Sequence, residues 1–203
     1  MKLVEIPSTI TQLLTDRFSH DERSEGLHAS QIWEDLHASV QTKKRSALAA
    51  DKLSEFGTVG FIWERVLEQT LASIMVDNPI DHGRYFRPGE QCVDGIYLTP
   101  DYCDLNYNGN WVHGVEEWKV RWCSYRKADN LEQNFWKMIV QQKAYCHALQ
   151  TPYSRLRMLF LVGDWRSDIT PKMREFELEF TSRELQENWS MITNHARRRG
   201  WLK

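Results

Sequence analysis

Residues 91–98 read Gln-Cys-Val-Asp-Gly-Ile-Tyr-Leu, and residues 111–120 read Trp-Val-His-Gly-Val-Glu-Glu-Trp-Lys-Val. Both stretches are rich in the β-branched and aromatic residues that favour strands. Asn-Tyr-Asn-Gly-Asn at 106–110 predicts a turn between them, so we expect a hairpin with a loop from Thr99 to Asn110. The first strand carries an acid, Asp94, and the second carries Glu117 and Lys119 two residues apart.

Alternation with a period of two assigns the side chains of the second strand to two faces. We expect the core-facing side to carry Val112, Trp118, Val120 and Trp122, and the other side to carry His113, Val115, Glu117, Lys119 and Arg121. Taken alone, Glu117 and Lys119 favour an ordinary same-face salt bridge. Asp94 is either a turn residue before Gly95 or an acid that needs a partner among apolar neighbours.

A long helix is predicted over residues 57–76, ended by Pro79 and Gly83. Glu64 lies on the same face of this helix as two glycines that allow close packing. A glutamate on a packing face needs a partner. The alternative is a partly exposed charge at the edge of the apolar stripe.

Another helix is predicted after the hairpin. Asp129 and Glu132 resemble a capping box at its start, Pro152 ends it, and its buried side carries Phe135, Ile139, Cys146 and Leu149. Gln141 and Tyr145 are neighbours at the edge of that stripe. As a lone pair they would be a surface glutamine beside a packing tyrosine.

The flanking segments complete an α/β pattern. Ser8 and Ser30 fit the caps of two N-terminal helices. We expect a central strand over Arg155–Gly163, a half-exposed strand over Arg174–Phe180, and a last helix capped by Thr181 and Glu184 with Leu185, Trp189 and Ile192 buried. The basic tail from His195 to Lys203 is either a solvated helix end or a contact to phosphates.

In chain order, these signals form one constellation: Glu64, Asp94, Glu117-Trp118-Lys119 and Gln141-xxx-Tyr145. Over about residues 57–163 it resembles the PD-(D/E)xK nuclease superfamily, and most closely the RecB-like branch, which also resembles lambda-type exonuclease. Two departures stand out. No histidine lies between Gly57 and Glu64, and Val93 stands where a proline often precedes the aspartate.

The resemblance implies a phosphodiester-cutting site that uses Mg²⁺ or Mn²⁺, because hard cations take oxygen ligands. It assigns the metal to Asp94, Glu117, Glu64 and the main-chain carbonyl of Trp118. Lys119 would hold and help deprotonate the attacking water, since burial and a nearby metal lower the pKa of a lysine. Substrate contacts would come from Gln141, Tyr145, Arg121 and Lys143.

We therefore expect an α/β fold with a central mixed β-sheet flanked by α-helices, a restriction-endonuclease-like core, and extra N-terminal helices. Residues 1–203 would form a single domain, with a helical layer over 1–55, a catalytic core over 57–163, and a C-terminal strand and helix over 164–203. The expected function is a metal-dependent deoxyribonuclease, an exonuclease in preference to an endonuclease, in DNA recombination or repair. The alternative is the same fold without catalysis, as a nucleic-acid-binding or protein-binding module.

Composition is compatible with this function. The 203 residues are 41% hydrophobic and 27% charged, as in soluble globular proteins, and no run approaches the length of a membrane span. Without an apolar leader we expect a cytoplasmic protein. DNA is the expected partner at a net charge of -2, with RNA and a homo-oligomer left open. The four cysteines lack zinc spacing and none follows Cys146, so we expect free, mostly buried thiols and no iron–sulfur cluster.

Overall fold

A computed structural model describes residues 25–40, 62, 65–66, 69, 86–161 and 172–203. Its elements are β1 (Leu27–His28), α2 (Ala29–Val40), β2 (Gln91–Val93), β3 (Ile96–Leu98), β4 (Tyr102–Tyr107), β5 (Asn110–Arg121), η1 (Tyr125–Asn130), α5 (Leu131–Asn134), α6 (Trp136–Ala148), β6 (Tyr153–Phe160), β7 (Lys172–Glu179) and α7 (Ser182–Arg198). Of the helix predicted over 57–76, only residues 62, 65, 66 and 69 are described, and these are helical. Glu64 and the cap predicted at Ser8 lie outside the described residues.

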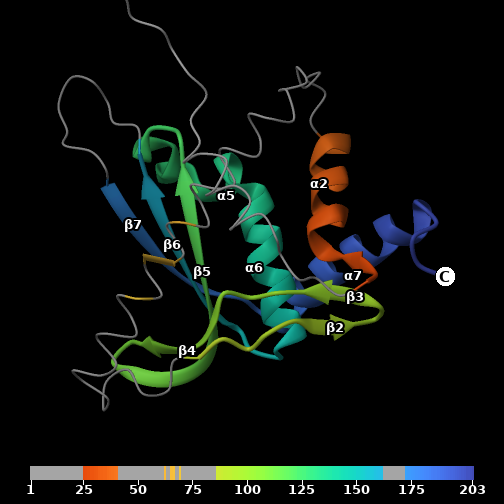
Figure 1. Ribbon diagram of the computed structural model, residues 1–203, viewed down its shortest axis with the longest axis horizontal. Coiled ribbons are helices and arrows are strands. Elements are labelled where there is room, and N and C mark those ends of the chain that lie inside the picture. The colour runs from red at the N-terminus through yellow and green to blue at the C-terminus, as the bar shows by residue number, and fades with distance from the viewer. Residues whose placement is uncertain (1–24, 41–61, 63–64, 67–68, 70–85, 162–171) are drawn as a thin grey trace, which may run out of the picture.

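The main sheet has the strand order β4-β5-β6-β7 and is mixed. β5 pairs with β4 antiparallel and with β6 parallel, and β6 pairs with β7 antiparallel. Two parallel neighbours need a crossover connection, and here η1, α5 and α6 provide it, so α6 lies across the sheet beside β5 (Figure 1). The predicted α/β fold with a central mixed sheet and helices packed on it is confirmed.

The helices pack on the sheet through one apolar layer. Val115 of β5 shares a core cluster with Ile139 and Tyr145 of α6 and Trp189 of α7. Leu156, Met158 and Phe160 of β6 lie on the same face of the sheet and pack against Phe135 and Met138. The expected central position of this strand is confirmed, since β6 has a strand on each side. It begins at Tyr153, before the predicted Arg155, and the expectation that both of its faces are covered is wrong, because Arg155 and Arg157 on the face away from the helices are only partly buried.

The expected core face of β5 is wrong in part. Val115 belongs to the main core although it was assigned to the other face. Trp118 is buried as predicted, but Val120 is only partly buried and Trp122 is exposed. Alternation assigned the residues of this strand to the correct two groups, but the group predicted to face the core is not the one that faces the helices. The error arose because both faces of the strand bury side chains in its middle.

The strand predicted over residues 91–98 is wrong. Asp94 (φ 51°) and Gly95 (φ 78°) form a tight turn between β2 and β3, which pair with each other. An Asp-Gly pair with two positive φ angles is the preferred two-residue hairpin turn. β3 also pairs with β1 in a separate sheet of order β1-β3-β2 (Figure 1). Asp94 is therefore the turn residue that was the alternative.

The segment predicted as a long loop after Thr99 contains a strand. β4 is the true partner of β5, and the turn between them is Asn108-Gly109, with both φ angles positive. The ladder shifts register between Cys103 and Leu105, where Asp104 has φ 63°. This irregularity interrupts the alternation of side chains, which is why the strand was not recognised.

The helix predicted from Asp129 begins later. Residues 125–130 form a 3-10 helix, and Phe135 (φ -127°) separates the short α5 from α6. The capping box of Asp129 and Glu132 is wrong, because Asp129 instead pairs with Arg174 at 2.6 Å. Phe135, Ile139 and Cys146 are buried as predicted, whereas Leu149 is only partly buried.

The last helix forms as predicted. Thr181 and Glu184 make the capping box of α7, and Leu185, Trp189 and Ile192 are buried. The end of α7 is held by Asp35 of α2, which pairs with His195 at 2.7 Å and with Arg199 at 2.6 Å. The guanidinium of Arg199 and the imidazole of His195 hold the pKa of the Asp35 carboxyl below its usual value. Two of the basic residues in the tail are thus engaged within the protein.

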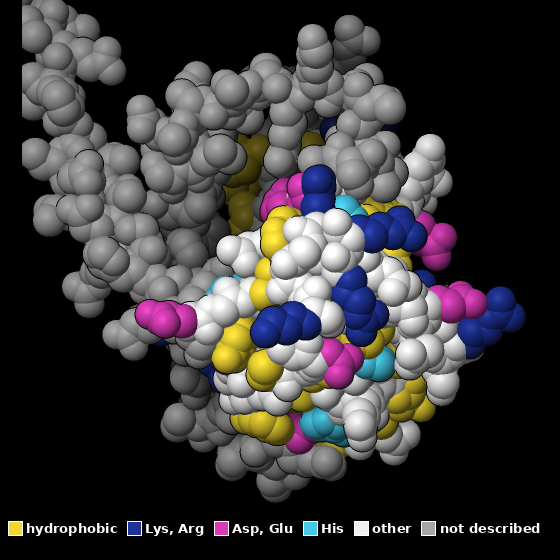
Figure 2. All heavy atoms as spheres, turned by 90° about the vertical axis from the view of Figure 1, so that its right-hand side faces the viewer, with side chains coloured by type: hydrophobic (Ala, Val, Ile, Leu, Met, Phe, Trp, Pro, Cys, Tyr) yellow, Lys and Arg dark blue, Asp and Glu magenta, His cyan; other side chains and the backbone are white. Residues whose placement is uncertain are grey.

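Figure 2 shows the face formed by this end of the molecule, where lysines and arginines are interspersed with acids and apolar side chains. Trp201, beyond α7, is 41% exposed. None of the described helices is long and apolar enough to cross a membrane.

Candidate functional site

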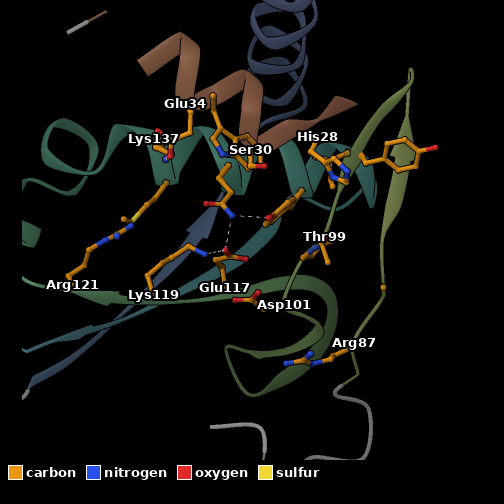
Figure 3. A pocket seen from close by; sticks show the side chains of 18 residues that line it. His28, Ser30, Glu34, Arg87, Thr99, Asp101, Glu117, Lys119, Arg121 and Lys137 are labelled. Carbon is orange, nitrogen blue, oxygen red and sulfur yellow. Dashed lines mark hydrogen bonds and ion pairs between the residues drawn. The ribbon is translucent and has the colours of Figure 1, made fainter. Parts of the chain in front are cut away.

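A pocket of about 510 Å³ lies between β5 and the helices α2 and α6. β5 contributes Glu117, Lys119 and Arg121 to its lining, and α6 contributes Gln141 and Tyr145 (Figure 3). The rest of the lining comes from Lys137 and Met138 of α6, from α2, β1 and β3, and from the segments that flank β2 and β3. Most of the predicted site residues that the structure describes therefore line one pocket.

Period-two alternation on β5 places Glu117, Lys119 and Arg121 on the face that looks toward α6. Glu117 is 1% exposed, and its Oε1 accepts a hydrogen bond from the Lys119 ammonium. The predicted salt bridge is thus present. It lies at the wall of the pocket, with a buried carboxylate, rather than on an open sheet surface.

Gln141 and Tyr145 are one helical turn apart on α6 and act together on Glu117. Gln141 Nε2 donates to Glu117 Oε1 at 2.7 Å and lies 2.8 Å from the Tyr145 hydroxyl. Gln141 is 8% exposed and Tyr145 4%. The alternative of a surface glutamine is wrong, since its amide reaches down to the strand and orients the buried carboxylate.

Asp101 also lines the pocket, although it is not among the predicted site residues. It lies just before β4, and its Oδ2 accepts a hydrogen bond from the Trp118 backbone N–H at 2.9 Å. That amide directly follows Glu117, so the two acids lie beside the same stretch of backbone (Figure 3). The N–H and C=O of one residue in a strand point to the same side, so the Trp118 carbonyl is directed toward the side on which Asp101 lies.

The sequence contained a signal for Asp101. Pro100 precedes it, whereas Val93 precedes Asp94, and the resemblance noted from the sequence often has a proline before the aspartate. In addition, β4 pairs Tyr102 with Glu116, so the residue before Tyr102 falls next to Glu117. This register depends on the shift between Cys103 and Leu105, because the Asn108-Gly109 turn alone would place Tyr102 opposite Val115. Recognising β4 from the turn would have placed Asp101 at the end of the strand beside β5, but its position next to Glu117 also needs the irregularity at Asp104.

Asp94 lies elsewhere. Its Oδ2 accepts a hydrogen bond from Trp189 Nε1 of α7 at 2.8 Å, and it does not line the pocket. The Trp189 ring stacks on His147, whose pKa is lowered by burial and raised less by Asp94. The structure therefore does not bring Asp94 to Glu117 and Lys119. Its contacts join the β2–β3 turn to α6 and α7.

Of the two remaining predicted substrate contacts, Arg121 and Lys143, only the first lines the pocket. Arg121 lines the pocket, and burial lowers its pKa while Cys123 and Glu117 raise it. Lys143 lies outside the pocket lining, 3.4 Å from Glu184 and 5.3 Å from the centre of the Phe180 ring. A lysine that was not predicted, Lys137 of α6, lines the pocket instead.

The oxygen atoms beside the pocket are of the types that bind a small divalent cation. Asp101, Glu117 and the Trp118 carbonyl are all oxygen donors, and two of them are carboxylates. Glu117 is a buried carboxylate beside a cavity, a place where a cation offsets the penalty of burying charge. Within the described part of the chain, no group of three or more His, Cys, Asp and Glu residues could hold a metal ion.

The cysteines are free, as expected. Cys103 and Cys146 are buried, Cys123 is partly buried, and Cys92 is exposed, so "mostly buried" holds for half of them. Burial, with a smaller contribution from Asp104, raises the pKa of the Cys103 thiol to about 12.

No protein-family model matches the chain, and no curated protein is similar to it. Among solved structures it is similar to SSO0001 (TM-score 0.47, 13% identity, 92% of this chain and 86% of that chain). It is also similar to a phage-related exonuclease from Haemophilus somnus (0.45, 10%, 83% and 78%). A further similar structure is the alkaline exonuclease LHK-Exo of Laribacter hongkongensis with dAMP (0.42, 10%, 92% and 91%). Likeness at this level carries no residue roles over to this chain.

Proposed function

We propose that the chain is a divalent-metal-dependent nuclease that hydrolyses phosphodiester bonds of DNA, as an exonuclease. One observation carries the proposal. A buried glutamate and a lysine of β5 and an aspartate just before β4 line a single pocket together with a glutamine and a tyrosine of the crossover helix. These are the residue types that the sequence resemblance requires, with Asp101 in the role predicted for Asp94.

Asp101, Glu117 and the Trp118 carbonyl would hold Mg²⁺ or Mn²⁺, with Glu64 as an additional candidate outside the described residues. The cation, when bound, neutralises charge on the phosphodiester and on the leaving alkoxide. Lys119 Nζ, held by Glu117, positions the attacking water and takes part in moving its proton. Gln141 keeps the Glu117 carboxylate in place, and Tyr145 in turn contacts the Gln141 amide.

The test is a nuclease assay on linear, circular and single-stranded DNA, and on RNA, with Mg²⁺, Mn²⁺ or EDTA. We expect metal-dependent release of nucleotides from linear DNA that Asp101→Asn and Lys119→Ala reduce by roughly 100-fold or more. Asp94→Asn is the matched control, an aspartate outside the pocket, and should stay within about 3-fold of wild type. Equal degradation by Lys119→Ala, or loss with Asp94→Asn but not with Asp101→Asn, would contradict the proposal.

Calorimetric titration with Mn²⁺ separates the nuclease from a non-catalytic binding module. We expect binding in wild type that is lost in Asp101→Asn and in Glu117→Gln. Absence of Mn²⁺ binding together with retained binding of DNA would favour the module.

A further inference from the structure

Besides Lys119, the described residues that line the pocket include three Lys and Arg side chains that the proposed hydrolysis does not use: Arg87, which precedes β2, and Arg121 and Lys137. Arg121 lies two residues beyond Lys119 on the same face of β5, and Lys137 lies one helical turn before Gln141 on α6. In Figure 3 Arg121 lies to the left of Lys119, away from Asp101, and Lys137 lies above Lys119, beside Glu34. Arg121 and Lys137 therefore bring positive charge to the pocket from two elements, β5 and α6.

The Nε–H group of Arg121 is a buried donor without an acceptor among the described residues. A buried donor without an acceptor costs about 1–3 kcal/mol, and a guanidinium stays protonated even when buried. This side chain therefore suits an anion that enters the pocket, and the fork of its N–H groups matches two phosphate oxygens.

Lys137, in contrast, is already paired with a carboxylate, that of Glu34. Its ammonium forms an ion pair with Glu34 of α2 at the rim of the pocket (Figure 3). Burial lowers the pKa of Lys137 to about 8, so its charged form benefits from an anionic partner. Glu34 is 43% exposed in its side chain and is not packed so tightly that it must stay in place.

We propose that Arg121 and Lys137 form a second phosphate subsite, which binds the phosphate next to the one that is cut, and that Glu34 pairs with Lys137 until that phosphate arrives. Residues two apart on a strand are about 6.6 Å apart, comparable to the spacing of successive phosphates along an extended strand. The inference rests on the proposed function and narrows its substrate. The pocket takes a polynucleotide with consecutive phosphates in preference to a mononucleotide or a simple phosphodiester.

The test pairs a side-chain change with a change in the substrate. Fluorescence anisotropy in EDTA measures binding of a short 5′-phosphorylated single-stranded oligodeoxynucleotide and of variants with one neutral methylphosphonate linkage, moved along the strand. For wild type we expect one linkage whose neutralisation weakens binding about 10-fold. Arg121→Met should weaken binding of the unmodified strand by a similar factor. Neutralising that linkage should then not weaken binding to the variant any further, because the contact between Arg121 and this phosphate is already absent.

The lysine and its partner give two further readouts. Lys137→Met should weaken binding, and Lys143→Met, on the same helix but outside the pocket, should leave it within about 2-fold. Arg183→Met is the corresponding control for Arg121, since Arg183 is exposed and pairs within α7. Glu34→Gln should tighten binding by about 2- to 5-fold, a gain that a merely structural role for Glu34 does not produce.

Each outcome decides the question. The subsite is overturned if no linkage stands out, if the losses from Arg121→Met and from neutralisation add at every position, or if Glu34→Gln fails to tighten binding. Arg121→Lys replaces Arg121→Met if the latter does not melt cooperatively. Because binding is measured without metal, the two proposals can fail separately. The expected binding results without any cleavage would support the subsite and contradict the proposed function. Cleavage without the expected binding results would support the function and contradict the subsite.

Discussion

Glu116 and Glu117 are consecutive carboxylates of β5, both almost fully buried, with opposite surroundings. Glu116, 0% exposed, accepts hydrogen bonds from the Trp118 indole and from Arg157 and lies 3.9 Å from Arg155. The two arginines continue to Glu175 and Glu177 of β7, each at 2.6 Å. Charge on this side is balanced by neighbouring strands.

Glu117, 1% exposed, has a lysine and a glutamine amide as partners and a pocket beside it. The comparison teaches that burial of an acid does not mark a site by itself. A carboxylate surrounded by guanidinium groups is part of the sheet's structure, whereas one whose remaining side faces a cavity can receive a ligand. The following experiments separate the two roles, from the largest expected effect to the smallest.

Glu117→Gln should abolish cleavage, with a loss of roughly 1,000-fold or more, because a carboxylate ligand is replaced by a neutral amide of the same shape. The free energy of unfolding should change by less than about 1 kcal/mol, because the penalty of burying the Glu117 carboxylate is removed and the remaining charge, on Lys119, faces the pocket and can be solvated. Initial rates and urea unfolding measure the two quantities. Retained activity would place the chemistry elsewhere.

Glu116→Gln should do the reverse. It leaves Arg155 and Arg157 without their buried partner, and we expect the free energy of unfolding to fall by about 3 kcal/mol. Cleavage per folded molecule should stay within about 3-fold of wild type. A loss of activity as large as that of Glu117→Gln, in protein that is folded by circular dichroism, would remove the distinction between the two acids.

Gln141→Leu tests how far the site depends on its helix. Removing the amide that holds Glu117 should lower metal affinity or activity about 10-fold, within the range for residues that orient a ligand. Tyr145→Phe, which keeps the packing of the ring, should have a smaller effect on the same measurements. Unchanged Mn²⁺ affinity in Gln141→Leu would show that Glu117 does not need this hydrogen bond.

Arg157→Lys should have the smallest effect. It keeps the charge and removes the planar group that contacts Glu116 and Glu175 together and lies 5.8 Å from the Trp118 ring centre. We expect the free energy of unfolding to fall by about 1 kcal/mol, with no change in cleavage. A drop in activity without a change in stability would mean that the back of the sheet takes part in the chemistry.

Local patterns predicted the elements that depend on nearest neighbours. Alternation placed Glu117, Lys119 and Arg121 on one face of β5, and i, i+4 spacing placed Gln141 beside Tyr145 on α6. The Thr181 and Glu184 box also needs only its own turn. These features could be read directly because the physics that produces them is local.

The partner strand of β5 could not be found by the same method. Asp94-Gly95 was read as strand although Asp-Gly favours a hairpin turn, and the irregularity at Asp104 hid β4. Asp101 was therefore missed. The contributions of Glu34 and Lys137 to the pocket depend on how α2 packs against α6, a contact between segments far apart in sequence that periodicity does not report.

The ion pairs of Asp35 with His195 and Arg199 have a practical consequence for anyone producing this protein. The pocket wall formed by Glu34 belongs to a helix whose adjacent residue is tied to His195 and Arg199, near the C-terminus. None of residues 195–203 lines the pocket, yet trimming them, or fusing a bulky tag there, would loosen α2. A preparation with low activity should therefore be checked first for proteolysis within residues 195–203.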